Sequence, residues 1–193
     1  MTLTHYFKEG FSYADYLRKI EDQLHDLEKS DKESEMIPHY ALNLKRIERL
    51  GKTFQLSDEQ KEALKSIKPN FKLLVISEGW CGDAAQVMPI VHVIAEELGI
   101  EQKVVLRDSH PELMDAYLTN GAKSIPIFVG VNEDGTEKFR FGPRPEMGMK
   151  LLAKHKENPD VYTKDVFHKE LQLWYNKDKG NSIFNELFEL MKL

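Results

Sequence analysis

The pattern of apolar and polar residues predicts helices in the first third of the chain. A helix is expected over residues 12–30, with Ser12 and Asp15 forming a capping box at its start. The residues expected on its inner face are Tyr16, Leu17, Ile20, Leu24 and Leu27. After the polar run SDKESE (30–35), a second helix is predicted from about Pro38 to Gly51. A third is predicted over 57–67, with Ser57 and Gln60 as a further capping box.

From residue 71 the pattern changes to short apolar runs, which indicate strands. The run FKLLVIS (71–77) is nearly continuous, as expected for a strand covered on both faces. Further strands are predicted over 103–107, 125–131 and 138–141, and further helices over 82–98, 111–118 and 145–156. Right-handed strand–helix–strand crossovers give parallel neighbours, whereas the turn NEDGTE gives an antiparallel pair. The sequence therefore predicts an α/β fold with a mixed central β-sheet flanked by helices. A first edge strand near KTFQL (52–56) is an open alternative.

Helical patterns return near the end of the chain, at about 163–176 and 181–192. The last of these carries an apolar stripe formed by Ile183, Phe184, Leu187, Phe188 and Met191. Two interpretations remain open. The stripe is either core, packed on the N-terminal helices, or a self-association surface that would make the protein a homodimer.

Composition and charge narrow the classes of protein that fit. The 193 residues are 41% hydrophobic and 31% charged, which is typical of one globular domain covering residues 1–193. The net charge is −5 and no dense Lys/Arg cluster occurs, so we expect no nucleic-acid partner. No apolar run reaches the ~20 residues needed to cross a membrane, and the start lacks the pattern of a signal peptide. With one cysteine, no internal disulfide forms, and we expect a cytoplasmic protein.

That single cysteine, Cys81 in EGWCGDAAQ (78–86), is the main candidate for chemistry. It follows a predicted strand and opens a predicted helix, where unpaired backbone N–H groups and the helix dipole lower a thiol pKa. Asp83, two residues on, raises it. The sequence therefore predicts two opposing effects on the Cys81 pKa. We expect an exposed, reactive thiol, and the alternative is an inert buried cysteine.

Two separated motifs resemble the thioredoxin superfamily. WCGDA (80–84) stands where thioredoxins carry Trp-Cys-Gly-Pro-Cys, and GAKSIPIFV (121–129) is similar to their loop with a cis-proline before the third core strand. Gly142 also stands where thioredoxins tend to place a glycine after the last strand. The resemblance implies a thioredoxin-like fold over about residues 57–156, with helical extensions at 1–56 and 157–193.

The same resemblance implies roles for individual residues. Cys81 would be the catalytic nucleophile, and Trp80, Gly82 and Asp83 would lie beside the substrate. Ile125 would pair through its backbone with the partner, and Pro126 would be a cis-proline against the sulfur. The alternatives are a plain packing role for Trp80 and an ordinary trans bond at Pro126, because only about 5–6% of X–Pro bonds are cis.

Two positions depart from the thioredoxin pattern. Ala84 stands in place of the resolving cysteine, and Val75 in place of the buried acid that helps proton transfer to that cysteine. An unassisted dithiol cycle is therefore excluded. Glu78 lies nearer the site, and we expect it to be a solvated loop residue.

The remaining motifs give no other chemistry. The seven histidines lack ligand spacing, no P-loop or dinucleotide fingerprint occurs, and we expect no metal and no cofactor. The favoured hypothesis is a monothiol thiol–disulfide oxidoreductase whose partner is a disulfide-containing protein or a low-molecular-weight thiol. The alternative hypothesis is a non-catalytic, thioredoxin-fold protein-binding module.

Overall fold

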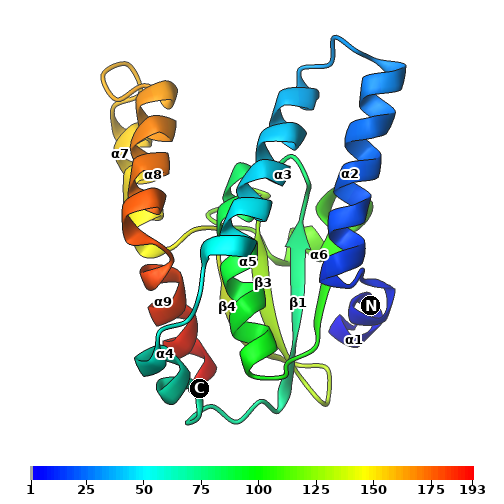
Figure 1. Ribbon diagram of the computed structural model, residues 1–193, viewed down its shortest axis with the longest axis vertical. Helices are drawn as coiled ribbons and strands as arrows, with labels where there is room; N and C mark the ends of the chain where they lie inside the picture. Colours follow the sequence, from blue (N-terminus) through cyan, green and yellow to red (C-terminus); the bar gives the residue numbers. More distant parts are fainter. Residues whose placement is uncertain (1) are drawn as a thin grey trace.

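A four-stranded β-sheet lies at the centre of the computed structural model, which describes residues 2–193 (Figure 1). The strand order across the sheet is β2-β1-β3-β4. The strands are β1 (Phe71–Ser77), β2 (Gln102–Leu106), β3 (Ile127–Asn132) and β4 (Glu137–Phe141).

The strands pair as a mixed sheet, as predicted, but the parallel pairing expected for the second strand–helix–strand unit was wrong, because β3 lies beside β1 and not beside β2. β1 runs parallel to β2 and antiparallel to β3, and β3 runs antiparallel to β4. Ile76 lies opposite Ile127, and Phe128 lies opposite Phe141. This register brings the carboxyl ends of β1 and β4 to the same edge as the start of β3.

Nine α-helices surround this sheet within residues 2–193. They are α1 (Leu3–Glu9), α2 (Tyr13–Ser30), α3 (Met36–Thr53), α4 (Asp58–Leu64), α5 (Gly82–Glu97), α6 (Pro111–Ala116), α7 (Glu146–Glu157), α8 (Lys164–Asp178) and α9 (Asn181–Met191). A 3-10 turn, Arg107–Ser109, follows β2.

Local capping chemistry was predicted correctly at several helix ends. The Ser12 side chain accepts the Asp15 N–H at 3.1 Å, and Ser57 and Gln60 form the reciprocal capping box of α4. Gly99, with φ +65°, follows the end of α5 in the left-handed conformation that glycine adopts without strain. These interactions lie within a few residues of each other, so the local sequence determines them.

Other boundaries differ from the prediction. α3 continues past Gly51 to Thr53, so KTFQL contains no strand. The edge of β2 is instead contacted by Phe11, whose N–H and C=O both bond Val104 at 2.8 Å. The sequence also missed α1, and β3 begins at Ile127, two residues later than predicted.

Two helical pairs flank α5 in Figure 1, with α2 and α3 on one side and α7 and α8 on the other. α3 packs directly on α5, and α9 packs on α5 and β4. In α9 the buried stripe residues are Ile183, Phe184, Leu187 and Met191, so the core interpretation is confirmed. The predicted neighbours were wrong, because the stripe covers α5 and the sheet rather than packing mainly on the N-terminal helices. Among the helices of residues 2–193, none combines the length and the apolar composition that a membrane-spanning segment needs.

Candidate functional site

Cys81 is the N-cap residue of α5, directly after the loop that leaves β1. Its sulfur accepts the Ala84 N–H at 3.5 Å, and its S–H donates to the Ile125 carbonyl oxygen at 3.4 Å. The residue is only 7% exposed. The expectation of an exposed thiol was therefore wrong, because the loop before Pro126 and the flanking helices cover all but a small part of the residue.

Burial decides the balance of effects on this thiol. Desolvation is the main cause that raises the pKa of Cys81 to about 12, and the Asp83 carboxylate also raises it, whereas the backbone amides of Ala84 and Asp83 and the Arg144 charge lower it. The resting thiol is therefore protonated at neutral pH, which agrees with its donating a hydrogen bond to Ile125.

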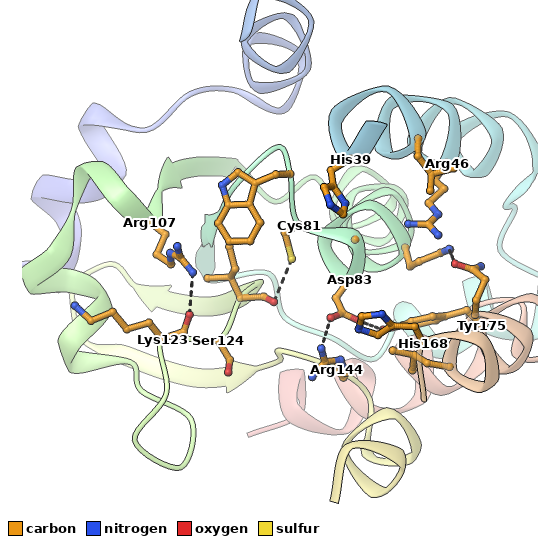
Figure 2. Close-up of a pocket in the computed structure, with 17 residues that line it drawn as sticks. His39, Arg46, Cys81, Asp83, Arg107, Lys123, Ser124, Arg144, His168 and Tyr175 are labelled. Atoms are coloured by element: carbon orange, nitrogen blue, oxygen red, sulfur yellow. Dashed lines mark hydrogen bonds and ion pairs between the residues drawn. The ribbon is translucent and has the colours of Figure 1, made fainter. Parts of the chain in front are cut away.

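The small exposed part of Cys81 faces a pocket of about 490 Å³. Figure 2 shows Cys81 between two groups of polar side chains, with Arg107 and Lys123 on one side and Asp83, Arg144 and His168 on the other. The pocket is lined by His39, Leu42, Arg46, Trp80, Cys81, Gly82, Asp83, Gln86, Arg107, Lys123, Ser124, Ile125, Arg144, His168, Leu171, Gln172 and Tyr175. Its walls thus come from α3, the start of α5, the loops beside β2 and β3, and α8.

On one side of the Cys81 sulfur, Asp83 forms a network of polar contacts with two other side chains. Its carboxylate pairs with Arg144 at 2.6 Å, and both side chains are largely buried, at 12% and 16% exposed. Tyr175 of α8 donates its hydroxyl to Asp83 at 3.1 Å. Burial, followed by the Asp83 charge, raises the Tyr175 pKa well above its usual value, so this phenol remains a hydrogen-bond donor at neutral pH. The network ties the first turn of α5 to α8 and to the segment after β4.

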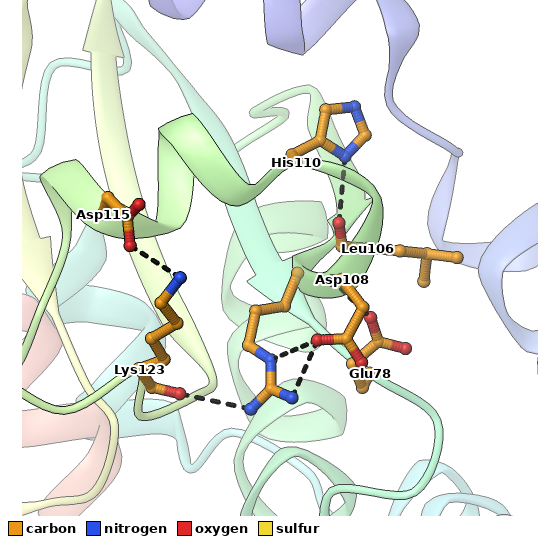
Figure 3. Close-up of polar contacts among 7 residues, drawn as sticks. Glu78, Leu106, Asp108, His110, Asp115 and Lys123 are labelled. Carbon is orange, nitrogen blue, oxygen red and sulfur yellow. Dashed lines mark hydrogen bonds and ion pairs between the residues drawn. The ribbon is translucent and has the colours of Figure 1, made fainter.

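On the opposite side of the sulfur, Trp80 lies under a guanidinium group. The Arg107 guanidinium carbon is 4.6 Å from the Trp80 ring centroid, which is cation–π distance. Arg107 also bonds the Asp108 carboxylate at 2.8 Å and the Lys123 carbonyl at 3.3 Å, as Figure 3 shows. Trp80 therefore both lines the pocket and packs against Arg107.

Glu78 is buried, at 4% exposed, which overturns the expectation of a solvated loop residue. Its carboxylate accepts the Asp108 N–H at 2.9 Å (Figure 3), and desolvation raises its pKa. Glu78 therefore holds the turn after β2 against the loop after β1.

Arg46 approaches the site from α3. Its Nη1 donates to the Asn43 side-chain oxygen at 3.3 Å, and Asn43 in turn donates to the Gly79 carbonyl at 3.0 Å. A Cβ added at Gly82 would lie 3.3 Å from Arg46 Nη1, so the guanidinium rests on the first turn of α5. Glycine at position 82 leaves room for this approach.

Five of the six site residues implied by the resemblance line the pocket: Trp80, Cys81, Gly82, Asp83 and Ile125. The sixth, Pro126, is buried behind Ile125 and does not line it. The Ile125–Pro126 peptide bond is cis, and so is Gly142–Pro143.

The sequence did not indicate the cations Arg46, Arg107, Lys123 and Arg144 or the α8 residues His168 and Tyr175. One signal was available for Arg144, because it follows β4 at the edge where β1 also ends. No comparable signal existed for α3 and α8, whose contacts with the site depend on how distant helices pack.

No group of three or more His, Cys, Asp or Glu side chains in the described part of the chain is arranged to hold a metal ion. The chemistry of the pocket therefore rests on one thiol, several cations and hydrogen-bonding groups.

Comparison with known proteins gives a family and two similar structures. A family model described as thioredoxin matches residues 30–157. This match includes α3, which the motif resemblance left outside the core. A crystal structure of a protein of unknown function from Pseudomonas aeruginosa is 15% identical, with a TM-score of 0.68 over 100% of this chain and 98% of that one. An HIV epitope-scaffold protein is 16% identical, with a TM-score of 0.64 over 100% and 98%. No curated protein matches the chain. At these identities the structural likeness shows the fold alone.

Proposed function

Because the chain belongs to the thioredoxin family, we propose that it is a monothiol thiol–disulfide oxidoreductase in which Cys81 is the nucleophile. One observation carries this proposal: the Cys81 sulfur caps α5 and forms part of the wall of a pocket of about 490 Å³. We expect a disulfide in this pocket to contact the Cys81 sulfur without unfolding of the site. The helix-end amide of Ala84 is already directed at the sulfur and stabilises negative charge that develops there.

The reaction is an exchange of sulfur–sulfur bonds. The Cys81 thiolate attacks one sulfur of a substrate disulfide, a new S–S bond forms to Cys81, and the second substrate sulfur leaves as a thiolate that takes up a proton. Ala84 has no thiol, so an external thiol attacks the mixed disulfide and restores Cys81. The substrate sulfur leaves Cys81 bonded to this external thiol, and a second thiol equivalent releases it, so two thiols supply the two electrons and end as a disulfide.

The high thiol pKa makes this reaction strongly pH-dependent. With a pKa of about 12, roughly one molecule in 10⁵ holds a thiolate at pH 7, although such a thiolate is intrinsically more nucleophilic. The exchange rate is expected to rise about tenfold per pH unit from pH 7 to pH 10, because the thiolate fraction rises in that proportion.

The deciding experiment measures reduction of a disulfide by wild-type protein and Cys81→Ser, with an external thiol as reductant. Catalysed turnover by the wild type that disappears in Cys81→Ser supports the proposal. Equal rates for the wild type and Cys81→Ser would refute the proposal.

A second candidate, a thioredoxin-fold binding module without turnover, is favoured by the buried and protonated thiol together with Ala84 and Val75. Under this alternative the wild type gives no rate above the background reaction at any pH from 7 to 10. Ligands of the pocket would then bind wild type and Cys81→Ser equally.

A further inference from the structure

The charges in the pocket are unevenly balanced. It is lined by four cations, Arg46, Arg107, Lys123 and Arg144, but by one carboxylate, that of Asp83. Three of the cations have a carboxylate partner: Arg144 pairs with Asp83 at 2.6 Å, Arg107 with Asp108 at 2.8 Å and Lys123 with Asp115 at 2.7 Å. Figure 3 shows the Lys123–Asp115 pair and the contacts of Asp108.

Arg46 is the exception. Within residues 2–193 no carboxylate lies within ion-pair distance of it, and its guanidinium donates only to the neutral side chain of Asn43. That contact holds Nη1 over Gly82, at the first turn of α5, where the positive end of the helix dipole also favours an anion. A partly buried guanidinium and a helix start therefore face the same space beside Cys81.

We infer that the pocket binds a low-molecular-weight disulfide bearing carboxylate groups, and that Arg46 binds one carboxylate while Cys81 meets the disulfide. The inference rests on the proposed exchange activity and names its substrate class. A pocket of about 490 Å³ lies within the range of small-molecule sites. Because Cys81 is 7% exposed, its partner has to lie inside the pocket, and a small ligand fits there more readily than a folded protein's disulfide.

The bond changes are those of the proposed reaction. Cys81 sulfur bonds to one half of the ligand, and the other half leaves as a thiol after taking up a proton. A low-molecular-weight or protein thiol then attacks the ligand sulfur of the mixed disulfide, which breaks its bond to Cys81, restores the Cys81 thiol and leaves the second half bonded to the attacking thiol. A second thiol equivalent releases that half as a thiol, and the two reductant sulfurs end as a disulfide.

A series of three small disulfides of similar length tests the charge preference directly. Bis(2-carboxyethyl) disulfide is doubly negative, bis(2-hydroxyethyl) disulfide is neutral and cystamine is doubly positive. Calorimetric titration of each into Cys81→Ser measures binding without chemistry. The dianion is expected to bind at least about tenfold more tightly than the neutral disulfide, since charge-assisted bonds to a guanidinium are strong. Its affinity is expected to fall as salt is added. Equal affinities, or tighter binding of cystamine, overturn the inference.

Two further substitutions in the Cys81→Ser background test which residue causes the preference for the dianion. They are Arg46→Gln and Arg49→Gln. Both remove one positive charge from α3, but Arg49 is exposed and does not line the pocket. Arg46→Gln is expected to weaken binding of the dianion about tenfold or more, and Arg49→Gln to change it less than about threefold. Equal losses would mean that general electrostatics, not Arg46, binds the ligand. Turnover by the wild type is scored separately: anion-selective binding without turnover refutes the exchange activity but keeps the binding site.

Discussion

The Cys81 thiol is subject to two neighbouring charges of opposite sign. The Asp83 carboxylate raises its pKa and the Arg144 guanidinium lowers it, while these two groups pair with each other at 2.6 Å. Desolvation is the larger cause of the high pKa. The Asp83–Arg144 pair is nevertheless the charged part of the site that single substitutions can change.

Asp83→Asn is expected to make Cys81 more reactive. Loss of the carboxylate removes one raising effect and leaves Arg144 uncompensated, so the thiol pKa falls and more thiolate is present at any pH below it. The rate of iodoacetamide alkylation between pH 7 and pH 10, followed by mass spectrometry, is expected to increase by about tenfold.

Arg144→Met is expected to raise the pKa of Cys81 and to slow its alkylation, because it removes the cation and leaves the Asp83 carboxylate without its ion-pair partner near the sulfur. Arg140→Met serves as the control, since Arg140 is partly exposed, pairs with Glu137 and does not line the pocket. Slower alkylation in Asp83→Asn than in the wild type would contradict this electrostatic account.

At the residue scale, the sequence located the sulfur but not its surroundings. Cys81 and Ile125 lie in motifs that the chain order brings together, and they are in contact at 3.4 Å. The burial of Cys81 and Glu78 was missed, because exposure depends on distant segments. Arg46 and Tyr175 reach the site from α3 and α8, and nothing in EGWCGDAAQ indicates that either helix lies there.

At the scale of elements, Gly142 fixes the approach of the chain after β4 to the start of β3. Its φ is +115°, and a Cβ added there would lie 2.2 Å from the Pro126 carbonyl oxygen. Both the backbone conformation and the close approach require glycine. The resemblance drew attention to this position, and the contact supplies a physical reason for it.

Gly142→Ala is expected to lower the free energy of unfolding by about 2–4 kcal/mol, because a backbone segment has to shift or accept strain. Gly51→Ala is the matched control. Gly51 lies in the last turn of α3, where an added Cβ would meet no atom within 4 Å, so this change is expected to stabilise by about 0.5–1 kcal/mol. Urea unfolding of both variants measures the difference. Equal stability of Gly142→Ala and wild type would contradict the expected clash.

The elements themselves were predicted well where the signal is local. The N-cap bond of Ser12, the capping box at Ser57 and the periodicity of α5 act within one or two helical turns. The sequence left open whether KTFQL forms an edge strand, and the structure shows that it does not. Lys52 and Thr53 continue α3, and Phe11 contacts the outer edge of β2 instead. Which segment lies along a sheet edge is decided by long-range packing, which the local pattern does not contain.

At the scale of the whole molecule, the terminal helices belong to the same packed structure as the sheet. α9 contributes Leu187 and Met191 to an apolar layer that also contains Phe71, Ile94 and Phe139. α8, which precedes it, contributes Tyr175 to the pocket. The packing of α9 therefore stabilises the sheet and helps to fix the end of α8 beside the site.

Leu187→Ala measures how much the core contacts of α9 contribute to stability. Leu187 is 1% exposed, so its truncation removes buried apolar surface and leaves a cavity, which is expected to lower the free energy of unfolding by about 2–5 kcal/mol. Leu173→Ala in α8 is the control, because Leu173 is 60% exposed and its truncation is expected to cost less than about 0.5 kcal/mol.

Urea unfolding at two protein concentrations tests whether the α9 stripe also takes part in self-association. A core role gives a loss that is independent of concentration, because folding of one chain buries Leu187. A loss that is larger at the higher concentration and shrinks on dilution, with a lower mass of the variant by light scattering, would instead mean that the stripe binds a second copy of the chain.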